Sequence, residues 1–151
     1  MVYKLTSKLS VGDSAYIAGL IDGEGTITLT RKHANENRRV AITISCTERQ
    51  ILEFVLSCTD AGRITNMRRS RENHPPSFTY AIYNRQALTL LDQVTPFLRS
   101  YKKIRSQLIL DSCLKLTPRN GKYSEAILEE RQVFEQQVLS TKANSSAGLK
   151  S

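Results

Sequence analysis

The chain has 151 residues and carries 22 lysine and arginine side chains against 14 aspartate and glutamate side chains, so its net charge is +8. This length predicts one domain with room for a hydrophobic core, and the excess positive charge favours a polyanionic partner such as nucleic acid. No apolar run approaches the roughly 18 residues of a membrane span, and the start of the chain lacks a signal-type apolar core, so we expect a soluble intracellular protein. The three cysteines are widely spaced, which excludes a disulfide framework and a CxxC metal site.

The first predicted element is a helix over residues 10–24 that ends in two carboxylates. Small residues recur at every fourth position and would form one smooth ridge: Ala15, Gly19 and Gly23. A ridge of this kind lets another backbone approach closely. Asp22 and Glu24 lie at the carboxyl end of the helix, where the helix dipole disfavours negative charge. Acids at this unfavourable end indicate a chemical role.

Two copies of a hairpin-and-helix unit follow this helix. Residues 26–45 alternate between apolar and polar side chains on both sides of a polar, Asn-rich loop at 31–39, and residues 63–83 repeat the pattern more weakly. Helical patterns follow each hairpin and continue in two further helices. One of these spans residues 97–116, and we expect it to bury Ile104, Leu108 and Cys113. Residues 140–151 have no apolar periodicity and read as a disordered tail.

This order predicts an α+β fold with a four-stranded antiparallel sheet covered by helices on one face. The other face would stay exposed, and its first hairpin carries short polar and basic side chains: Thr28, Thr30, Lys32, Arg39, Thr43 and Ser45. Such side chains suit hydrogen bonds to base edges and phosphates, and a two-stranded ribbon fits the major groove. An ordinary solvated face is the alternative interpretation, because threonine favours strands in any case. In the second hairpin, the side on which the large residues of segment 77–83 lie is ambiguous.

Residues 16–25, Tyr-Ile-Ala-Gly-Leu-Ile-Asp-Gly-Glu-Gly, closely resemble the motif that names the LAGLIDADG homing endonucleases. The repeated strand–strand–helix unit, the Thr47-Glu48-Arg49-Gln50 junction and Pro96-Phe97-Leu98 before a lysine-rich helix also match, so the resemblance covers about residues 8–117. It implies one αββαββα domain over residues 1–139 with a saddle-shaped sheet and C-terminal helices. A single motif implies the homodimeric branch of the family.

The resemblance also implies a metal site at the end of the first helix. Glu24 corresponds to the metal-binding carboxylate of the family, although the name motif has aspartate there, and Gly23 would add a backbone carbonyl. Mg²⁺ is the expected cofactor; we expect Mn²⁺ to substitute for it and Ca²⁺ to support DNA binding with little cleavage. We interpret the other acid of the motif, Asp22, as structural.

Two further catalytic positions follow from the resemblance. Glu48 falls where related enzymes place a polar residue near the hydrolytic water, although they often have glutamine there. Lys102 matches a basic residue that stabilises charge at the scissile phosphate, and Lys103 is its rival if the spacing shifts by one residue. Ordinary phosphate contacts from this basic helix start are the alternative.

The same resemblance implies the surfaces of a DNA-bound homodimer. The dimer interface would be built from small residues and one acid: Ala15, Ala18, Gly19, Asp22 and Gly23. The DNA contacts would come from the sheet and its loops: Thr28, Thr30, Lys32, His33, Asn35, Arg38, Arg39, Thr43, Ser45, Arg68, Arg69 and Arg71.

The resemblance therefore implies an intron-encoded homing endonuclease that cuts both strands of a long pseudo-palindromic DNA site. Neither a membrane nor a small-molecule substrate is expected, and the compartment would be the cytoplasm or an organelle, depending on the host. A non-cleaving binder on the same fold, such as an intron maturase or a regulator, is the first alternative. An unrelated basic RNA-binding protein, such as a ribosomal component, would explain the charge but not the motif.

Overall fold

The computed structural model describes residues 5–67, 76–112 and 124–142. Its elements follow in this order along the chain: α1 (Val11–Glu24), β1 (Gly25–Thr30), β2 (Arg39–Cys46), α2 (Arg49–Thr59), β3 (Arg63–Met67), β4 (Ser77–Tyr83), α3 (Asn84–Val94), the 3-10 helix η1 (Thr95–Phe97), α4 (Tyr101–Ser112) and α5 (Glu125–Ser140). The predicted αββαββα order with additional C-terminal helices is confirmed.

The four strands form one antiparallel sheet in the order β1-β2-β4-β3. The alternation predicted from the sequence is also confirmed, because the aliphatic residues of β1 and β2 are buried on the helix side. The ambiguity in the second hairpin is resolved as well: Tyr80 and Ile82 face the helices, with 0% and 1% exposure. Consequently, the other face of the sheet carries mostly polar and small residues.

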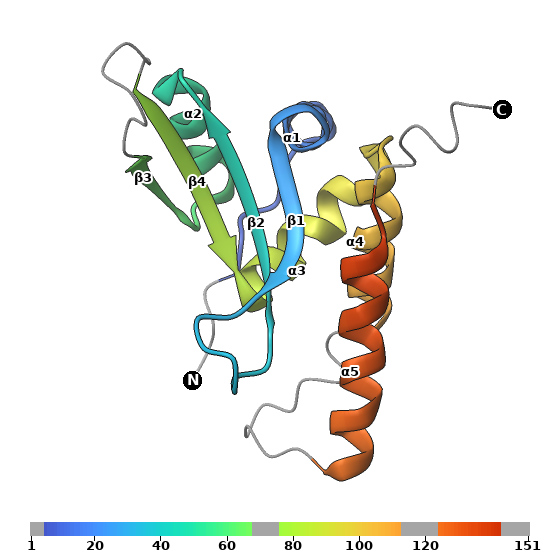
Figure 1. The fold of residues 1–151 in the computed structure, drawn as a ribbon. Helices are drawn as coiled ribbons and strands as arrows, with labels where there is room; N and C mark the ends of the chain where they lie inside the picture. Colours follow the sequence, from blue (N-terminus) through green and yellow to red (C-terminus); the bar gives the residue numbers. More distant parts are fainter. Residues whose placement is uncertain (1–4, 68–75, 113–123, 143–151) are drawn as a thin grey trace, which may run out of the picture.

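Three helices cover one face of the sheet and two stand beyond its edge (Figure 1). Helices α1, α2 and α3 pack against the strands, whereas α4 and α5 lie side by side next to β1. No helix in the described part of the chain is both long enough and apolar enough to cross a membrane.

Helix α1 is capped at its amino end and joined closely to the sheet at its carboxyl end. The Ser10 hydroxyl accepts the Asp13 backbone N–H at 3.1 Å and caps the amino end. At the carboxyl end, a Cβ on Gly25 would lie 2.7 Å from the Ile21 Cα and 3.1 Å from the Thr43 carbonyl oxygen. Only glycine fits this close approach, so Gly25 lets the helix pass directly into β1.

Helix α4 differs from the sequence expectation in its start and in its buried face. The 3-10 turn ends at Phe97, Leu98 is extended, and the α-helix begins only at Tyr101. Ile104 was predicted to be buried but is 57% exposed. The buried positions are instead Lys102, Arg105, Ser106 and Ile109. The polar side chains among them reach hydrogen-bond acceptors inside the protein, which makes their burial possible.

Some predictions about the C-terminal region lie outside the described residues. Helix α5 ends at Ser140, one residue beyond the predicted limit of the domain. Cys113 and residues 143–151 of the predicted tail are not described. The domain boundary at residue 139 therefore stays a prediction.

Candidate active site and nucleic-acid interface

The carboxyl end of α1 presents an acid that nothing else in the described structure engages. Glu24 is the last residue of the helix and is exposed, as is the neighbouring Gly23. Among the described residues, no hydrogen bond or ion pair holds the Glu24 carboxylate. The carboxylate is therefore available to a ligand from outside the chain.

Asp22, the other acid of the motif, is held within its own chain. Its carboxylate accepts the backbone N–H groups of Arg99 at 2.8 Å and Ser100 at 3.2 Å, and also the Ser100 hydroxyl. Burial by itself would raise the pKa of Asp22, but these hydrogen bonds and the nearby Lys102 together lower it below its ordinary value. Its contacts support the structural interpretation of this acid.

Lys102 is packed against the same helix end. It is 8% exposed, and its ammonium donates hydrogen bonds to the carbonyl oxygens of Ile21 at 2.7 Å and Asp22 at 2.9 Å. Burial lowers the pKa of Lys102, as does the positive charge of Arg105, while the carboxylates of Asp22 and Glu24 partly oppose this shift. Lys103 is half-buried, and its backbone N–H donates to the Ser100 carbonyl oxygen at 3.0 Å in the first turn of α4.

Glu48 lies at the same end of the sheet as Glu24. Gly25, the first residue of β1, pairs with Ile44, and β2 ends two residues later at Cys46. Glu48 then occupies the N-cap position of α2, and its exposed carboxylate accepts a hydrogen bond from the Gln50 amide at 3.4 Å. The end of the sheet where α1 enters therefore carries both predicted catalytic acids.

One chain offers the right ligand chemistry for a divalent cation, but too few ligands. The Glu24 carboxylate and the Gly23 carbonyl supply the oxygen atoms that hard cations prefer. Within the described ranges, however, no group of three or more His, Cys, Asp or Glu side chains is placed to hold a metal ion. Because Mg²⁺ takes about six oxygen ligands and usually keeps several waters, water or a bound polyanion would supply ligands beyond those of the described residues.

The small-residue ridge of α1 is uncovered in the single chain. A Cβ placed on Gly12, Gly19 or Gly23 would meet nothing within 4 Å, and Ala15 is also exposed. Gly12 extends the ridge by one residue that the sequence reading missed, although its spacing of seven from Gly19 places it on the same helix face. The prediction that Ala18 contributes to an interface is wrong, because it is 0% exposed and lies in the core of its own chain.

The uncovered face of the sheet carries the predicted DNA contacts that the strands supply. Five of them lie on it: Thr28, Thr30, Arg39, Thr43 and Ser45. The Ser45 and Thr79 hydroxyls form a hydrogen bond of 2.8 Å across β2 and β4, and the Arg39 guanidinium lies 4.2 Å from the centre of the Tyr83 ring. Thr79 and Tyr83 were not predicted as site residues, but the alternation of segment 77–83 could have indicated them once its register was known.

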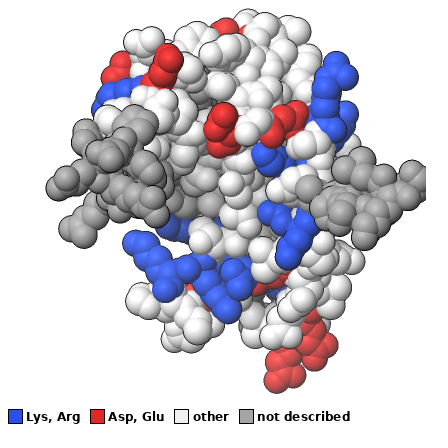
Figure 2. All heavy atoms as spheres, turned by 45° about the horizontal axis from the view of Figure 1, so that its top comes forward, with Lys and Arg blue, Asp and Glu red and all other residues white. Residues whose placement is uncertain are grey.

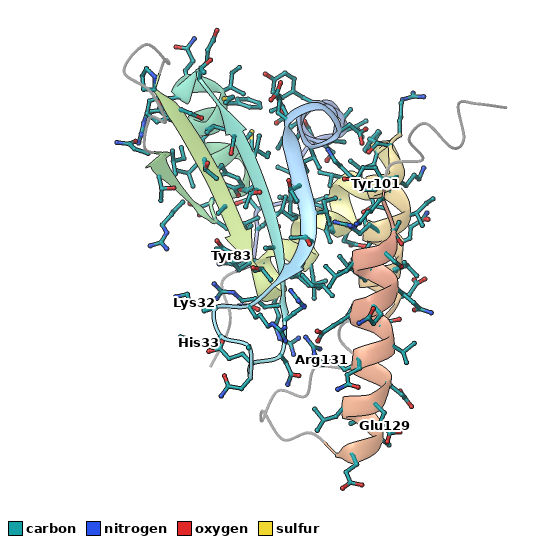
Figure 3. The ribbon with its side chains drawn as sticks, in the orientation of Figure 1. Lys32, His33, Tyr83, Tyr101, Glu129 and Arg131 are labelled. Atoms are coloured by element: carbon teal, nitrogen blue, oxygen red, sulfur yellow. The ribbon has the colours of Figure 1, made fainter. Side chains whose placement is uncertain are left out.

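The loop between β1 and β2 carries the other described DNA candidates. Lys32, His33 and Asn35 are exposed, and Figure 3 shows Lys32 and His33 at this end of the molecule. Arg38, also a predicted DNA contact, forms an ion pair within the chain: its Nε lies 3.5 Å from a carboxylate oxygen of Glu135 in α5. The candidates Arg68, Arg69 and Arg71 lie outside the described residues.

Charges are unevenly distributed over the molecule. On the face drawn in Figure 2, lysine and arginine side chains gather in a band across the lower half, below a few acidic side chains near the centre. A basic band of this kind attracts a polyanion electrostatically.

Comparisons with known proteins identify the fold. No protein-family model and no curated protein sequence matches the chain significantly. Among solved structures, the homing endonuclease I-CvuI in complex with its target aligns with 90% of this chain and 85% of its own, at a TM-score of 0.69 and 19% identity. The archaeal intron-encoded homing endonuclease I-Vdi141I complexed with DNA aligns with 89% of this chain and 86% of its own, at a TM-score of 0.67 and 17% identity.

Longer proteins contain the same unit. The LAGLIDADG homing endonuclease I-GzeII, in complex with its DNA target, aligns with 95% of this chain at a TM-score of 0.65 and 16% identity, but this alignment covers only 48% of I-GzeII. The structural neighbours are thus LAGLIDADG homing endonucleases, and the chain has their fold. The chain spans most of the length of I-CvuI and I-Vdi141I, and about half of the length of I-GzeII.

Proposed function

We propose that this chain is a site-specific DNA endonuclease that acts as a homodimer and hydrolyses one phosphodiester bond in each strand of its target. The observation that carries the proposal is the exposed, unengaged carboxylate of Glu24 at the end of a helix whose glycine ridge is uncovered. If two α1 helices pack through this ridge about a two-fold axis, their carboxyl ends lie close together. The two Glu24 carboxylates then meet beside the axis.

Such a pair of helix ends would bring more oxygen ligands together than the described part of one chain does. Glu24 and the Gly23 carbonyl of both chains, together with DNA phosphate oxygens, would hold Mg²⁺ or Mn²⁺. When bound, the metal would activate a water molecule and neutralise charge on the phosphate. Glu48 lies at the same end of the sheet, where its carboxylate would orient that water.

The uncovered sheet face and the β1–β2 loop support DNA as the substrate. Their hydroxyls and basic groups match base edges and phosphates, and the two subunits of a dimer would present them on both halves of a pseudo-palindromic site. The solved neighbours I-CvuI, I-Vdi141I and I-GzeII were captured with DNA. An intron-encoded origin would fit this function, as it does for I-Vdi141I.

The proposal is tested first by removing the charge of Glu24. We expect Glu24→Gln to lower the cleavage rate by at least about a thousandfold, because the metal loses its charged ligand, while DNA affinity changes less than about threefold. The control is Glu129→Gln, which neutralises an exposed acid on α5 and should cleave normally. Cleavage and band-shift assays in Mg²⁺ measure both properties. A Glu24→Gln protein that still cuts would contradict the assignment.

The substrate for this test must be found without assuming a target. I-CvuI was captured with the I-CreI target in the presence of Mg²⁺ with its DNA uncleaved, so a related site is not a safe substrate. A randomised DNA library incubated in Mg²⁺ and sequenced at its cut ends gives the site and the activity together. Replacing Mg²⁺ with Ca²⁺ should keep binding and suppress cutting. Specific binding without cutting in Mg²⁺ or Mn²⁺ would instead indicate a maturase or a regulator.

A further inference from the structure

The carboxyl end of α1 and the amino end of α4 cap each other. Three side chains make these contacts: Asp22, Ser100 and Lys102. The Asp22 carboxylate accepts both N–H groups that precede α4 and the Ser100 hydroxyl, while the Lys102 ammonium donates to the last carbonyl groups of α1. The Ser100 hydroxyl oxygen also accepts the Lys102 backbone N–H at 3.2 Å, so it links the two side chains.

Each helix end thereby receives a charge of the favourable sign. The carbonyl groups at a helix C-terminus lack partners and carry partial negative charge, whereas the N–H groups at an N-terminus carry partial positive charge. The Lys102 ammonium of α4 lies at the carbonyl groups that end α1, and the Asp22 carboxylate of α1 lies at the N–H groups that begin α4. The acids that end α1 are unfavourable for that helix by itself, and a buried ammonium from the neighbouring helix offsets them.

The position of Glu24 depends on this arrangement. No side-chain contact in the described structure holds the Glu24 carboxylate, and glycines lie on both sides of it in the sequence. The backbone of the last helical turn therefore sets the position of its Cα atom and the direction in which its side chain leaves the helix. The Ile21 carbonyl in that turn accepts two hydrogen bonds, from the Gly25 N–H and from the Lys102 ammonium.

We propose that Lys102 is a positioning residue, which fixes the carboxyl end of α1 and so the place of Glu24, and that it does not contact the scissile phosphate. Two of its three N–H donors are already used inside the chain, and the side chain is 8% exposed. This inference rests on the proposed nuclease function for its consequence, because Glu24 must reach a metal ion. Misplacing a catalytic group by about 1 Å is enough to lose much of its effect.

The first test measures the free, metal-free protein. We expect Lys102→Met to increase hydrogen exchange at the Gly25, Arg99 and Ser100 amides by about tenfold, the change expected when charge-assisted hydrogen bonds are lost. Lys103→Met is the matched control, because it removes a lysine one residue further along α4. It should leave these amides unchanged. Equal exchange in the Lys102→Met and wild-type proteins would overturn the inference.

The second test separates positioning from phosphate contact by titrating Mg²⁺ in the cleavage assay. A misplaced Glu24 should raise the Mg²⁺ concentration needed for half-maximal rate by about tenfold, and saturating Mg²⁺ should recover most of the wild-type rate. A lysine that stabilises the phosphate would instead lower the rate at every Mg²⁺ concentration and leave the half-maximal concentration unchanged. That result would overturn the inference.

Two further outcomes are also decisive. If Lys102→Met does not fold, Ser100→Ala provides a milder variant, because it removes one hydroxyl and keeps both charges. It should change amide exchange and the Mg²⁺ requirement in the same direction by a smaller factor, and no change in either would contradict the inference. If the wild-type protein cuts no DNA, the proposed function fails, and the exchange measurement still decides whether Lys102 holds the helix end.

Discussion

Tyr80 shows how a single polar atom is accommodated in the core of this protein. Its ring is fully buried, and its hydroxyl donates to the Ala61 carbonyl at 2.7 Å and lies 3.0 Å from the Thr59 hydroxyl. Burial raises the pKa of Tyr80 from 10.0 to about 12, and the hydrogen bond with Thr59 opposes this shift in part. The phenol therefore keeps its proton in the folded chain at pH values where the unfolded chain loses it.

This protonation difference gives a pH-dependent prediction for Tyr80→Phe. At pH 8 we expect the variant to be less stable by about 1–2 kcal/mol, because Thr59 and Ala61 lose a buried partner. As the pH rises from 10 towards 12, the folded wild-type binds more protons than its unfolded state and so loses stability. Urea midpoints should thus converge for the two proteins above pH 10. A constant difference would show that Tyr80 does not titrate as its burial requires.

Residue positions could be predicted from the sequence where spacing along a helix defines them. The helix end at Glu24 and the glycine ridge with its spacing of four were expected in this way and are exposed, whereas their roles stay predictions. Lys102 was expected at the scissile phosphate because the family resemblance matches it to a basic residue there, and the burial of its side chain was not foreseen. Its burial depends on carbonyl groups 80 and 81 residues away, which no local pattern shows.

At the scale of elements, α5 supports the base of the β1–β2 loop. Arg131 is 2% exposed; its guanidinium donates to the Arg38 carbonyl, and its Nε lies 3.1 Å from Glu135. Glu135 also pairs with the Arg38 side chain, so one carboxylate joins two arginines. Figure 3 shows Arg131 on the side of α5 that faces this loop. Helix α5 therefore positions the strand start that carries Arg39.

Removing the carboxylate of Glu135 should weaken this connection. Glu135→Gln removes the carboxylate that faces the buried Arg131 guanidinium at 3.1 Å, and we expect the loss of this charge pair to cost roughly 2–3 kcal/mol of stability. Amide exchange in the β1–β2 loop should increase, whereas Glu130→Gln on the exposed side of α5 should change neither property. Denaturant unfolding and hydrogen exchange measure the two effects. If the variant unfolds like the wild-type protein, α5 does not support the loop through Glu135.

Strands were easier to predict than helices because alternation depends only on neighbouring residues. The buried face of β1 and β2 was predicted directly from their aliphatic residues, such as Ile27 and Leu29. For α4, apolar periodicity placed Ile104 inside, but the helix packs through Lys102, Arg105 and Ser106. A buried face made of satisfied polar groups has no apolar signal.

At the scale of the whole molecule, the uncovered ridge on α1 decides whether two chains combine. Gly19 is the clean position to test, because a side chain there meets nothing within 4 Å in the single chain. Replacing an exposed helical glycine should even stabilise the isolated chain by about 0.5–1 kcal/mol. Any loss of assembly in such a variant then cannot be attributed to a damaged fold.

We therefore expect Gly19→Leu to sediment as a monomer, or to aggregate, since the leucine keeps two α1 backbones apart. Gln132→Leu adds the same exposed side chain on α5 and should remain a dimer. The monomer should also lose cleavage, because each chain supplies only one Glu24. A Gly19→Leu protein that sediments as a normal dimer would show that the chains meet elsewhere. A stable monomer that still cuts would mean that one chain completes the metal site by itself.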